Sequence, residues 1–272
     1  MDKTETAGER PIIARVVHRS TVVNQPGMPP VLKLMLNLVP GERRFEPGCD
    51  IAFAAEGDGS LRYYTVESVG QVPFEDSIDL TLYVRVGEQS QHGVASMLAA
   101  LSQGDTVPVR GPFAYPFYPP MGSRSNLVFI GAGCGMVPFR WLAHKIHGRR
   151  LDWMGKVLML EGSETGLEYQ YRNDPDTDQD QYFDAETFRA FERLKTRYSA
   201  VASDSGESTA ANMDAMWRLM GQGSVFVYVA GYRDVVERMH AAMDAHLRLQ
   251  GRWQEAREAL VRNGHWLEFV YG

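Results

Sequence analysis

The sequence predicts two domains in series, an antiparallel β-barrel followed by an α/β domain with a parallel sheet. Six short apolar segments, separated by Gly-, Pro- and Asp-rich turns, fill the first part of the chain, which is typical of a barrel. Beyond residue 121, short apolar segments alternate with longer helical patterns, as in a parallel sheet covered by helices. A length of 272 residues accommodates two domains of ordinary size.

The composition narrows the functional class. A hydrophobic content of 44% and a charged content of 23% exclude a disordered chain. A net charge of −6 argues against a nucleic-acid binder that works by bulk charge and against a polybasic membrane anchor. No apolar run approaches the roughly 18 residues of a membrane span, and the polar first ten residues lack a secretory signal. With two cysteines, Cys49 and Cys134, we predict no metal site and a reducing, cytoplasmic location.

The barrel is assigned to residues 11–121, after a tail of residues 1–10. Its clearest strand covers 31–39, where leucines at alternate positions face one side and Lys33, Met35 and Asn37 face the other. Turn signals such as Gly57-Asp58-Gly59 and Gly104-Asp105 separate the segments. The predicted strands are 12–17, 31–39, 51–55, 62–69, 78–86 and 106–110, and a short helix is predicted at 94–101.

The α/β domain is assigned to residues 122–272. Short apolar runs predict its strands, and longer segments with helical periodicity lie between them. The predicted strands are 127–130, 156–160, 198–202, 225–229 and 266–271, and the predicted helices are 137–147, 185–197, 212–220, 234–249 and 253–263.

A glycine-rich turn, Gly131-Ala132-Gly133-Cys134-Gly135, links the first strand of this domain to its first helix. Glycines let backbone amides approach a ligand closely, and the helix start that follows, with Pro138 in its first turn, favours an anion. Met136 stands where the third glycine of the Gly-x-Gly-x-x-Gly fingerprint would be. On the glycines alone, an ordinary tight turn and a methyltransferase-like loop stay open.

The trailing Pro138-Phe139-Arg140 decides between these alternatives, because the whole stretch resembles the nucleotide loop of the ferredoxin–NADP reductase family. Members of that family join a flavin-binding barrel to a nicotinamide-binding domain. Four more of its motifs occur in the family's order, and together the set spans most of the chain. They are Arg62-Tyr63-Tyr64-Thr65, Gly93-Val94-Ala95-Ser96, Tyr228-Val229-Ala230-Gly231 and the aromatic Tyr271, while Leu167-Glu168-Tyr169 and Tyr271 resemble the plant-type branch.

The resemblance implies FAD as a cofactor held by the barrel. Arg62 would bind the pyrophosphate with its fork of donors, and Tyr64, next to Tyr63, would stack on the isoalloxazine. Thr65 would place its hydroxyl at flavin N5, the atom that accepts the hydride. Tyr83 and Arg85 would contribute from a second contact strand, and the ring of Tyr271 would cover the flavin. The helix start that faces the pyrophosphate consists of Gly93, Val94, Ala95 and Ser96.

The resemblance also implies a bound NADH or NADPH. Cys134 occupies the family's usual Thr position and, with Thr65 and Tyr271, forms the expected catalytic set. The other expected nucleotide contacts lie at strand ends: Gly133, Gly135, Gly162, Ser163, Ser203, Asp204, Gly231 and Tyr232. One departure is Ala230, which stands where the family often has a cysteine close to the nicotinamide.

The activity implied is a reductase that transfers electrons between NAD(P)H and a one-electron carrier such as ferredoxin or flavodoxin. A local basic group, Arg140, Lys145, Arg149 and Arg150, offers an acidic carrier a docking face. Two alternatives stay open: a reductase component of an oxygenase or other dedicated system, and a non-catalytic nucleotide-sensing module, which Ala230 and Asp204 support.

Ser203-Asp204 replaces the Ser-Arg pair with which NADPH-selective members hold the 2′-phosphate. A carboxylate repels a phosphate and accepts hydrogen bonds from a ribose diol, and Glu161 is a second acidic candidate for that contact. We therefore expect a higher kcat/KM with NADH than with NADPH. A strong preference for NADPH in the same steady-state comparison would contradict this assignment.

Overall fold

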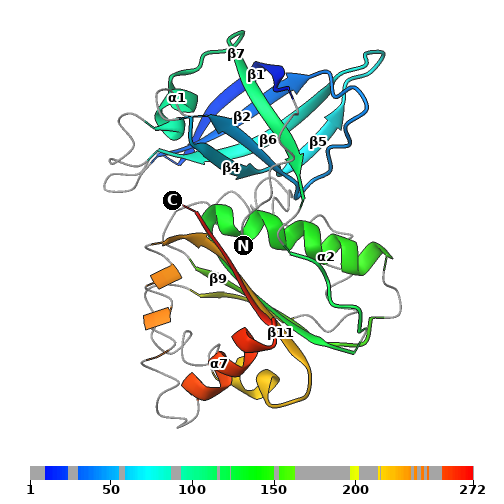
Figure 1. Ribbon diagram of the computed structural model, residues 1–272, viewed down its shortest axis with the longest axis vertical. Helices are drawn as coiled ribbons and strands as arrows, with labels where there is room; N and C mark the ends of the chain where they lie inside the picture. Colours follow the sequence, from blue (N-terminus) through cyan, green and yellow to red (C-terminus); the bar gives the residue numbers. More distant parts are fainter. Residues whose placement is uncertain are drawn as a thin grey trace, which may run out of the picture. The chain divides into compact units, whose positions relative to one another are not determined.

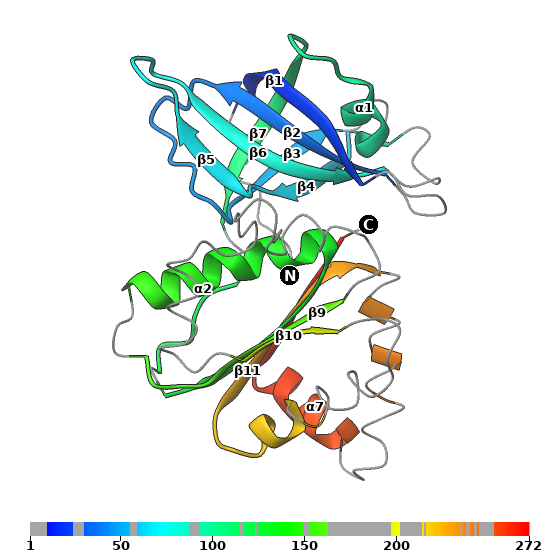
Figure 2. The same ribbon diagram turned by 180° about the vertical axis from the view of Figure 1, so that it is seen from behind.

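The computed structural model consists of two compact units, residues 1–115 and 116–272, each built on one sheet (Figures 1 and 2). The division thus falls slightly earlier in the chain than the boundary between Met121 and Gly122 expected from sequence. Among the residues that the structure describes, no helix is long and apolar enough to cross a membrane. The described residues are 10–23, 30–54, 59–86, 93–114, 117–122, 124–149, 153–162, 197–201, 214, 216–233, 236–237, 240–241, 244 and 253–271.

The first unit is an antiparallel barrel, as predicted. Its seven strands follow the order β4-β3-β7-β1-β2-β6-β5, and the sheet curls so that β4 also contacts β6. The alternating pattern of β2 is confirmed, since its four leucines are buried and pack with strands β6 and β7 and helix α1 in one core. The elements are β1 Ile12–Val23, β2 Val31–Leu38, β3 Asp50–Ala54, β4 Leu61–Thr65, β5 Ser68–Gln71, β6 Ile78–Arg85, α1 Val94–Ala100 and β7 Thr106–Phe113.

One strand prediction is wrong, because the segment 62–69 forms two strands rather than one. The backbone amide of Val66 donates to the carbonyl of Cys49 at 2.8 Å, whereas the amide of Glu67 donates to the carbonyl of Thr81 at 2.8 Å. The chain therefore changes its pairing partner from the β3 side to β6 between adjacent residues. Val66, at this corner between β4 and β5, is fully buried, so the apolar pattern of the sequence continues through the corner and gives no sign of it.

The second unit contains a parallel sheet in the order β10-β9-β8-β11-β12. Alternation along β8 sends Phe129 to one face, where it stacks on Phe139 of α2, and Val128 and Ile130 to the other, where Trp253 of α7 completes the core. The two helices accordingly cover opposite faces of the sheet (Figure 1). The elements are β8 Asn126–Ala132, the 3-10 turn η2 Gly133–Met136, α2 Val137–Arg149, β9 Val157–Gly162, β10 Arg197–Val201, β11 Val225–Tyr232, α7 Trp253–Arg262 and β12 Trp266–Tyr271.

The helix predictions for this unit are partly confirmed. Arg197, expected to end a helix, begins β10 instead, and residues 185–196 of that predicted helix lie outside the described residues. Within the predicted helices 212–220 and 234–249, the described residues are helical.

The η2 turn is held by backbone packing that only glycine allows. A Cβ added to Gly135 would overlap the carbonyl group of Ala230, and one added to Gly131 would overlap the sulfur of Met136. The turn therefore lies directly against the end of β11. At these two positions the glycines serve the junction between β8, η2 and β11, whatever ligand the turn binds.

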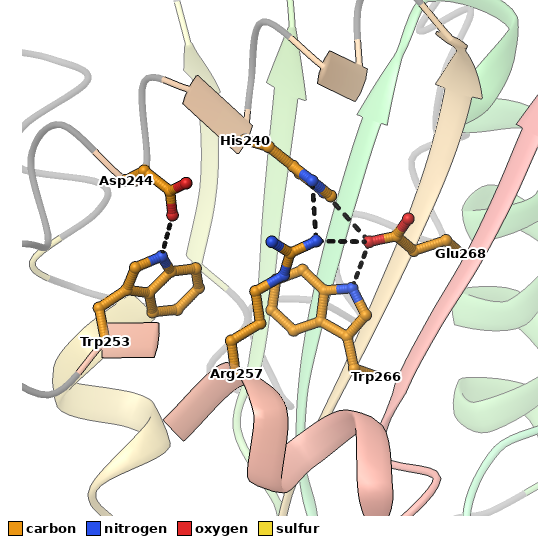
Figure 3. A network of polar contacts seen from close by, with 6 residues as sticks. All are labelled: His240, Asp244, Trp253, Arg257, Trp266 and Glu268. Carbon is orange, nitrogen blue, oxygen red and sulfur yellow. Dashed lines mark hydrogen bonds and ion pairs between the residues drawn. The ribbon is translucent and has the colours of Figure 1, made fainter. Parts of the chain in front are cut away.

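Strand β12 is tied to its neighbours by a polar network centred on Glu268 (Figure 3). Oε1 of Glu268 accepts from Nε1 of Trp266 at 2.5 Å and lies 3.5 Å from Nη2 of Arg257 on α7. The same Nη2 is 2.9 Å from Nδ1 of His240. A guanidinium only donates, so Nδ1 accepts and the ring proton lies on Nε2, which is 3.1 Å from Oε1.

These contacts, the one with His240 above all, hold the pKa of Glu268 at about 2, against an ordinary value of 4.5. The ring proton on Nε2 of His240 faces Oε1 at 3.1 Å, and this contact favours the charged carboxylate. Because the folded-state pKa is depressed, the carboxylate stabilises the fold above pH 4.5, and that contribution is lost as the pH falls from 4.5 towards 2.

Replacing Glu268 with Gln is expected to lower the melting temperature at neutral pH and to flatten its dependence on pH between 4.5 and about 2. Thermal unfolding followed by circular dichroism measures both effects. Glu258→Gln is the control, because this exposed carboxylate pairs only across one helical turn with Arg262. Identical pH profiles for the two variants would contradict the role of the network.

The packing of η2 predicts that Gly135→Ala destabilises the second unit by about 1–3 kcal/mol, the usual cost of forcing atoms into a filled space. Chemical denaturation gives the free energy of unfolding. Gly221→Ala is the matched control, because a Cβ there would meet only ordinary contacts at 3.6 Å and 3.9 Å. Equal stabilities of the two variants would show that the turn has room for a side chain.

Candidate functional site

Closure of the barrel brings together three segments that all lie between residues 61 and 100. Strand β4 and helix α1 both contact β6, although β4 and β6 lie almost at opposite ends of the sheet order. All the residues that the sequence analysis assigned to a flavin contact in this unit lie on these segments or at the start of α1. They are Arg62, Tyr63, Tyr64 and Thr65 on β4, Tyr83 and Arg85 on β6, and Gly93, Val94, Ala95 and Ser96 at α1.

On β4, the aromatic side chains are held in place and the cation is exposed. Tyr63 meets Phe113 edge-on, with ring centroids 5.1 Å apart, and Tyr64 meets Phe53 edge-on at 5.6 Å. Tyr64 also packs against the barrel core, so its position is set by the fold. Arg62 is exposed and therefore accessible to an anion.

Thr65 ends β4 beside a buried carboxylate that sequence reasoning missed. Its hydroxyl donates to Oδ1 of Asp50 at 2.9 Å, and Asp50 is 0% exposed. Asp50 pairs in register with Thr65 on one side and with Phe113 on the other. The available signal was an acidic residue at the start of an otherwise apolar strand.

The thiol of Cys49, next to Asp50 in the sequence, is unreactive. Burial, with a smaller contribution from Asp50, raises the pKa of Cys49 to about 12, so this thiol stays protonated at neutral pH. A nucleophilic or redox-active cysteine needs the thiolate. Cys49 is therefore a buried apolar side chain rather than a reactive group.

The start of α1 presents backbone rather than side-chain groups. Gly93 caps the helix with an extended backbone and no side-chain hydrogen bond. The side chain of Val94 is 2% exposed and belongs to the barrel core, so only its amide is available to a ligand. Ala95 and Ser96 are half-buried, as are Tyr83 and Arg85 on β6.

In the second unit, the predicted nucleotide contacts meet at the carboxyl ends of the strands. The register places Gly131 beside Ala230 and Ala132 beside Gly162. The η2 turn that follows contacts β8, β9 and β11. Between β8 and β11 the chain reverses the direction in which it adds strands, which is where parallel sheets bind ligands.

Of the predicted contacts, Gly133, Cys134 and Gly135 thus form the turn itself, and Gly162 and Gly231 lie at the ends of β9 and β11. Ser163, Ser203 and Asp204 lie outside the described residues, as does the side chain of Cys134. In the described part of the chain, no group of three or more His, Cys, Asp or Glu side chains could hold a metal ion.

Tyr271 ends β12 among other aromatic rings. It lies opposite Tyr232 in the register, with ring centroids 5.7 Å apart, and 5.1 Å from the ring of Phe269. Phe269 in turn packs on Phe117, a residue that the sequence analysis did not single out. Phe117 is 1% exposed and also contacts Phe139 and Tyr228.

Tyr228 of β11 is part of the support for this cluster rather than an acid–base group. Its hydroxyl donates to the carbonyl of Tyr118 at 2.7 Å, and burial raises its pKa. The phenol therefore stays neutral and ties the segment after residue 116 to the sheet. One face of β12 is thus fixed by aromatic rings and the other by the Glu268 network.

Comparison with curated proteins finds several ferredoxin–NADP reductases. A ferredoxin–NADP reductase of Thermosynechococcus vestitus is 24% identical over 94% of this chain and 72% of its own length. Another from Synechocystis is 22% identical over 94% of this chain and 66% of its own length, so this chain spans somewhat under two thirds of that relative. The chloroplastic leaf isozyme 1 of Arabidopsis thaliana is 23% identical over 85% of the chain and 69% of its own length. No family model matches.

Comparison with solved structures supports the fold. A ferredoxin–NADP reductase from Plasmodium falciparum, solved with 2′P-AMP, superposes with a TM-score of 0.57 at 13% identity and covers 96% of both chains. A cytochrome P450 reductase from Amycolatopsis gives a TM-score of 0.55 at 21% identity, over 89% of this chain and 69% of the other. With the five motifs placed in order along both units, the chain is similar in sequence and in fold to the ferredoxin–NADP reductases.

Proposed function

We propose that this protein is an FAD-dependent reductase that transfers electrons between NAD(P)H and a one-electron carrier such as ferredoxin or flavodoxin. The observation that carries the proposal is that the segments bearing the predicted flavin contacts of the barrel are neighbours, because β4 and α1 both contact β6. The shared name of the relatives, over 94% of the chain, supports it. When bound, FAD supplies the exchange between two-electron and one-electron chemistry.

The barrel residues suit a ligand that combines a pyrophosphate with a flat ring system. The exposed guanidinium of Arg62 and the amides from Gly93 to Ser96 would bind the pyrophosphate, with Arg85 as a second cation. The anchored rings of Tyr63 and Tyr64 would border the flavin, together with the half-buried Tyr83. Thr65 would hold its hydroxyl at N5.

The second unit would bind the nicotinamide nucleotide at the carboxyl edge of its sheet. The turn Gly133-Cys134-Gly135 and the strand ends at Gly162 and Gly231 would face the phosphates and riboses. Tyr232 would flank the nucleotide, and Tyr271 would stack on the reacting ring system. Ser163, Ser203 and Asp204 would complete the ribose contacts. Ala230 offers no thiol, so Cys134 is the cysteine proposed to act at the nicotinamide.

The carrier would dock through local charge, because the net charge of −6 repels an acidic partner over most of the surface. Lys145 of α2 is one cation of the proposed docking group, and its Nζ lies 3.7 Å from the ring centroid of Trp141. We also propose a reducing, cytoplasmic location, which the low cysteine content supports and cell fractionation would test.

The proposal is tested by FAD binding and by carrier reduction. Purified protein should reduce a ferredoxin or flavodoxin with NADH or NADPH as donor. Arg62→Ala should weaken FAD affinity by about 10–100-fold, because it removes charge-assisted hydrogen bonds to phosphate. Arg44→Ala is the control, since Arg44 is an exposed barrel arginine outside β4, β6 and α1. Equal FAD dissociation constants for the two variants would remove Arg62 from the site.

A further inference from the structure

We propose that Asp50 is a positioning residue that makes the hydroxyl of Thr65 a hydrogen-bond acceptor towards FAD N5, so that the site favours reduced over oxidised FAD. The proposal rests on the proposed function, which places Thr65 at N5. Its structural basis is the contact of 2.9 Å between Oγ1 of Thr65 and Oδ1 of Asp50.

The donor capacity of Thr65 is used up by this contact. A hydroxyl carries one hydrogen and two lone pairs. Because the hydrogen of Thr65 points to Oδ1 of Asp50, only lone pairs remain for a ligand. Thr65 ends β4 and is half-buried, whereas Asp50 is fully buried, so Thr65 is the member of the pair that a ligand can reach.

Asp50 is held firmly enough to impose this direction. It is 0% exposed, and it begins β3, which pairs with β4 on one side and with β7 on the other. A hydrogen bond to a buried carboxylate is stronger than one between neutral groups, and water cannot replace the donor there. Turning the hydroxyl outward would withdraw a donor from a desolvated charge.

The two redox states of FAD differ at the atom that Thr65 would meet. N5 of oxidised FAD carries a lone pair and no hydrogen, whereas N5 of reduced FAD carries a hydrogen. A hydroxyl restricted to accepting therefore opposes a lone pair in the first case and accepts a hydrogen bond in the second. The contact itself transfers no proton between Thr65 and Asp50.

Binding of both forms of FAD to the apoprotein tests the inference. Anaerobic titrations with FAD and with dithionite-reduced FAD give two dissociation constants for each variant. Thr65→Val should weaken binding of reduced FAD roughly three- to tenfold more than binding of oxidised FAD, the size of one hydrogen bond. Thr65→Ser should restore the wild-type ratio. If Thr65→Val weakens oxidised FAD equally or more, the inference is overturned.

A double-mutant cycle separates positioning from the charge of Asp50. Asp50→Ala should reduce the preference for reduced FAD roughly three- to tenfold more in wild type than in the Thr65→Val background. A tenfold difference equals about 30 mV in the two-electron midpoint potential, which is an independent readout. Asp50→Val, which likewise removes the acceptor, serves the same cycle if Asp50→Ala does not fold. Asp79→Asn is the control, because this carboxylate accepts from Asn37 between β2 and β6.

Equal effects of the Asp50 substitution in both backgrounds would mean that its charge acts through space, and the inference would fall. Loss of affinity for both forms without a change in their ratio would show a structural role only, and would also overturn it. A wild-type protein that binds neither form would instead remove the proposed function, and this inference with it.

Discussion

The second unit depends on one close approach, that of the Gly133–Met136 turn to the end of β11. A side chain at Gly135 would occupy the place of the Ala230 carbonyl. Because the turn connects β8 to α2, this contact decides where the first helix begins and how near backbone amides come to the edge of the sheet. Backbone packing therefore determines the shape of the sheet edge at which we propose the nucleotide binds. This packing is possible because Gly135 has no side chain.

In the barrel, closure of the sheet positions the candidate residues. Its change of pairing partner at Val66 and Glu67 ends β4 at Thr65 and lets β4 meet β6. The same corner leaves Thr65, which carries the proposed N5 hydroxyl, beside the fully buried carboxyl group of Asp50. In the second unit, both faces of β12 are fixed by contacts. Alternate residues of this strand belong to the Glu268 network on one face and to the Phe117 cluster on the other.

Local patterns in the sequence were sufficient to predict most elements, and they are also the basis on which the candidate site residues are proposed. The leucines of β2, the glycine turn and Arg62-Tyr63-Tyr64-Thr65 all carry their signal within a few residues. Contacts between distant segments leave no such signal. The corner at Val66, the pairing of Asp50 with Thr65 and the anchoring of Phe269 by Phe117 each depend on how strands meet in space, which a single sequence does not record.

The central claim, that this chain carries electrons from a nicotinamide through FAD, is tested most directly by the absorbance of the purified protein. We expect a yellow protein whose flavin absorbance bleaches when NADH or NADPH is added without oxygen, and returns when a ferredoxin or flavodoxin is supplied as acceptor. A colourless protein that takes up no added FAD, or a yellow one that neither coenzyme bleaches, would contradict it.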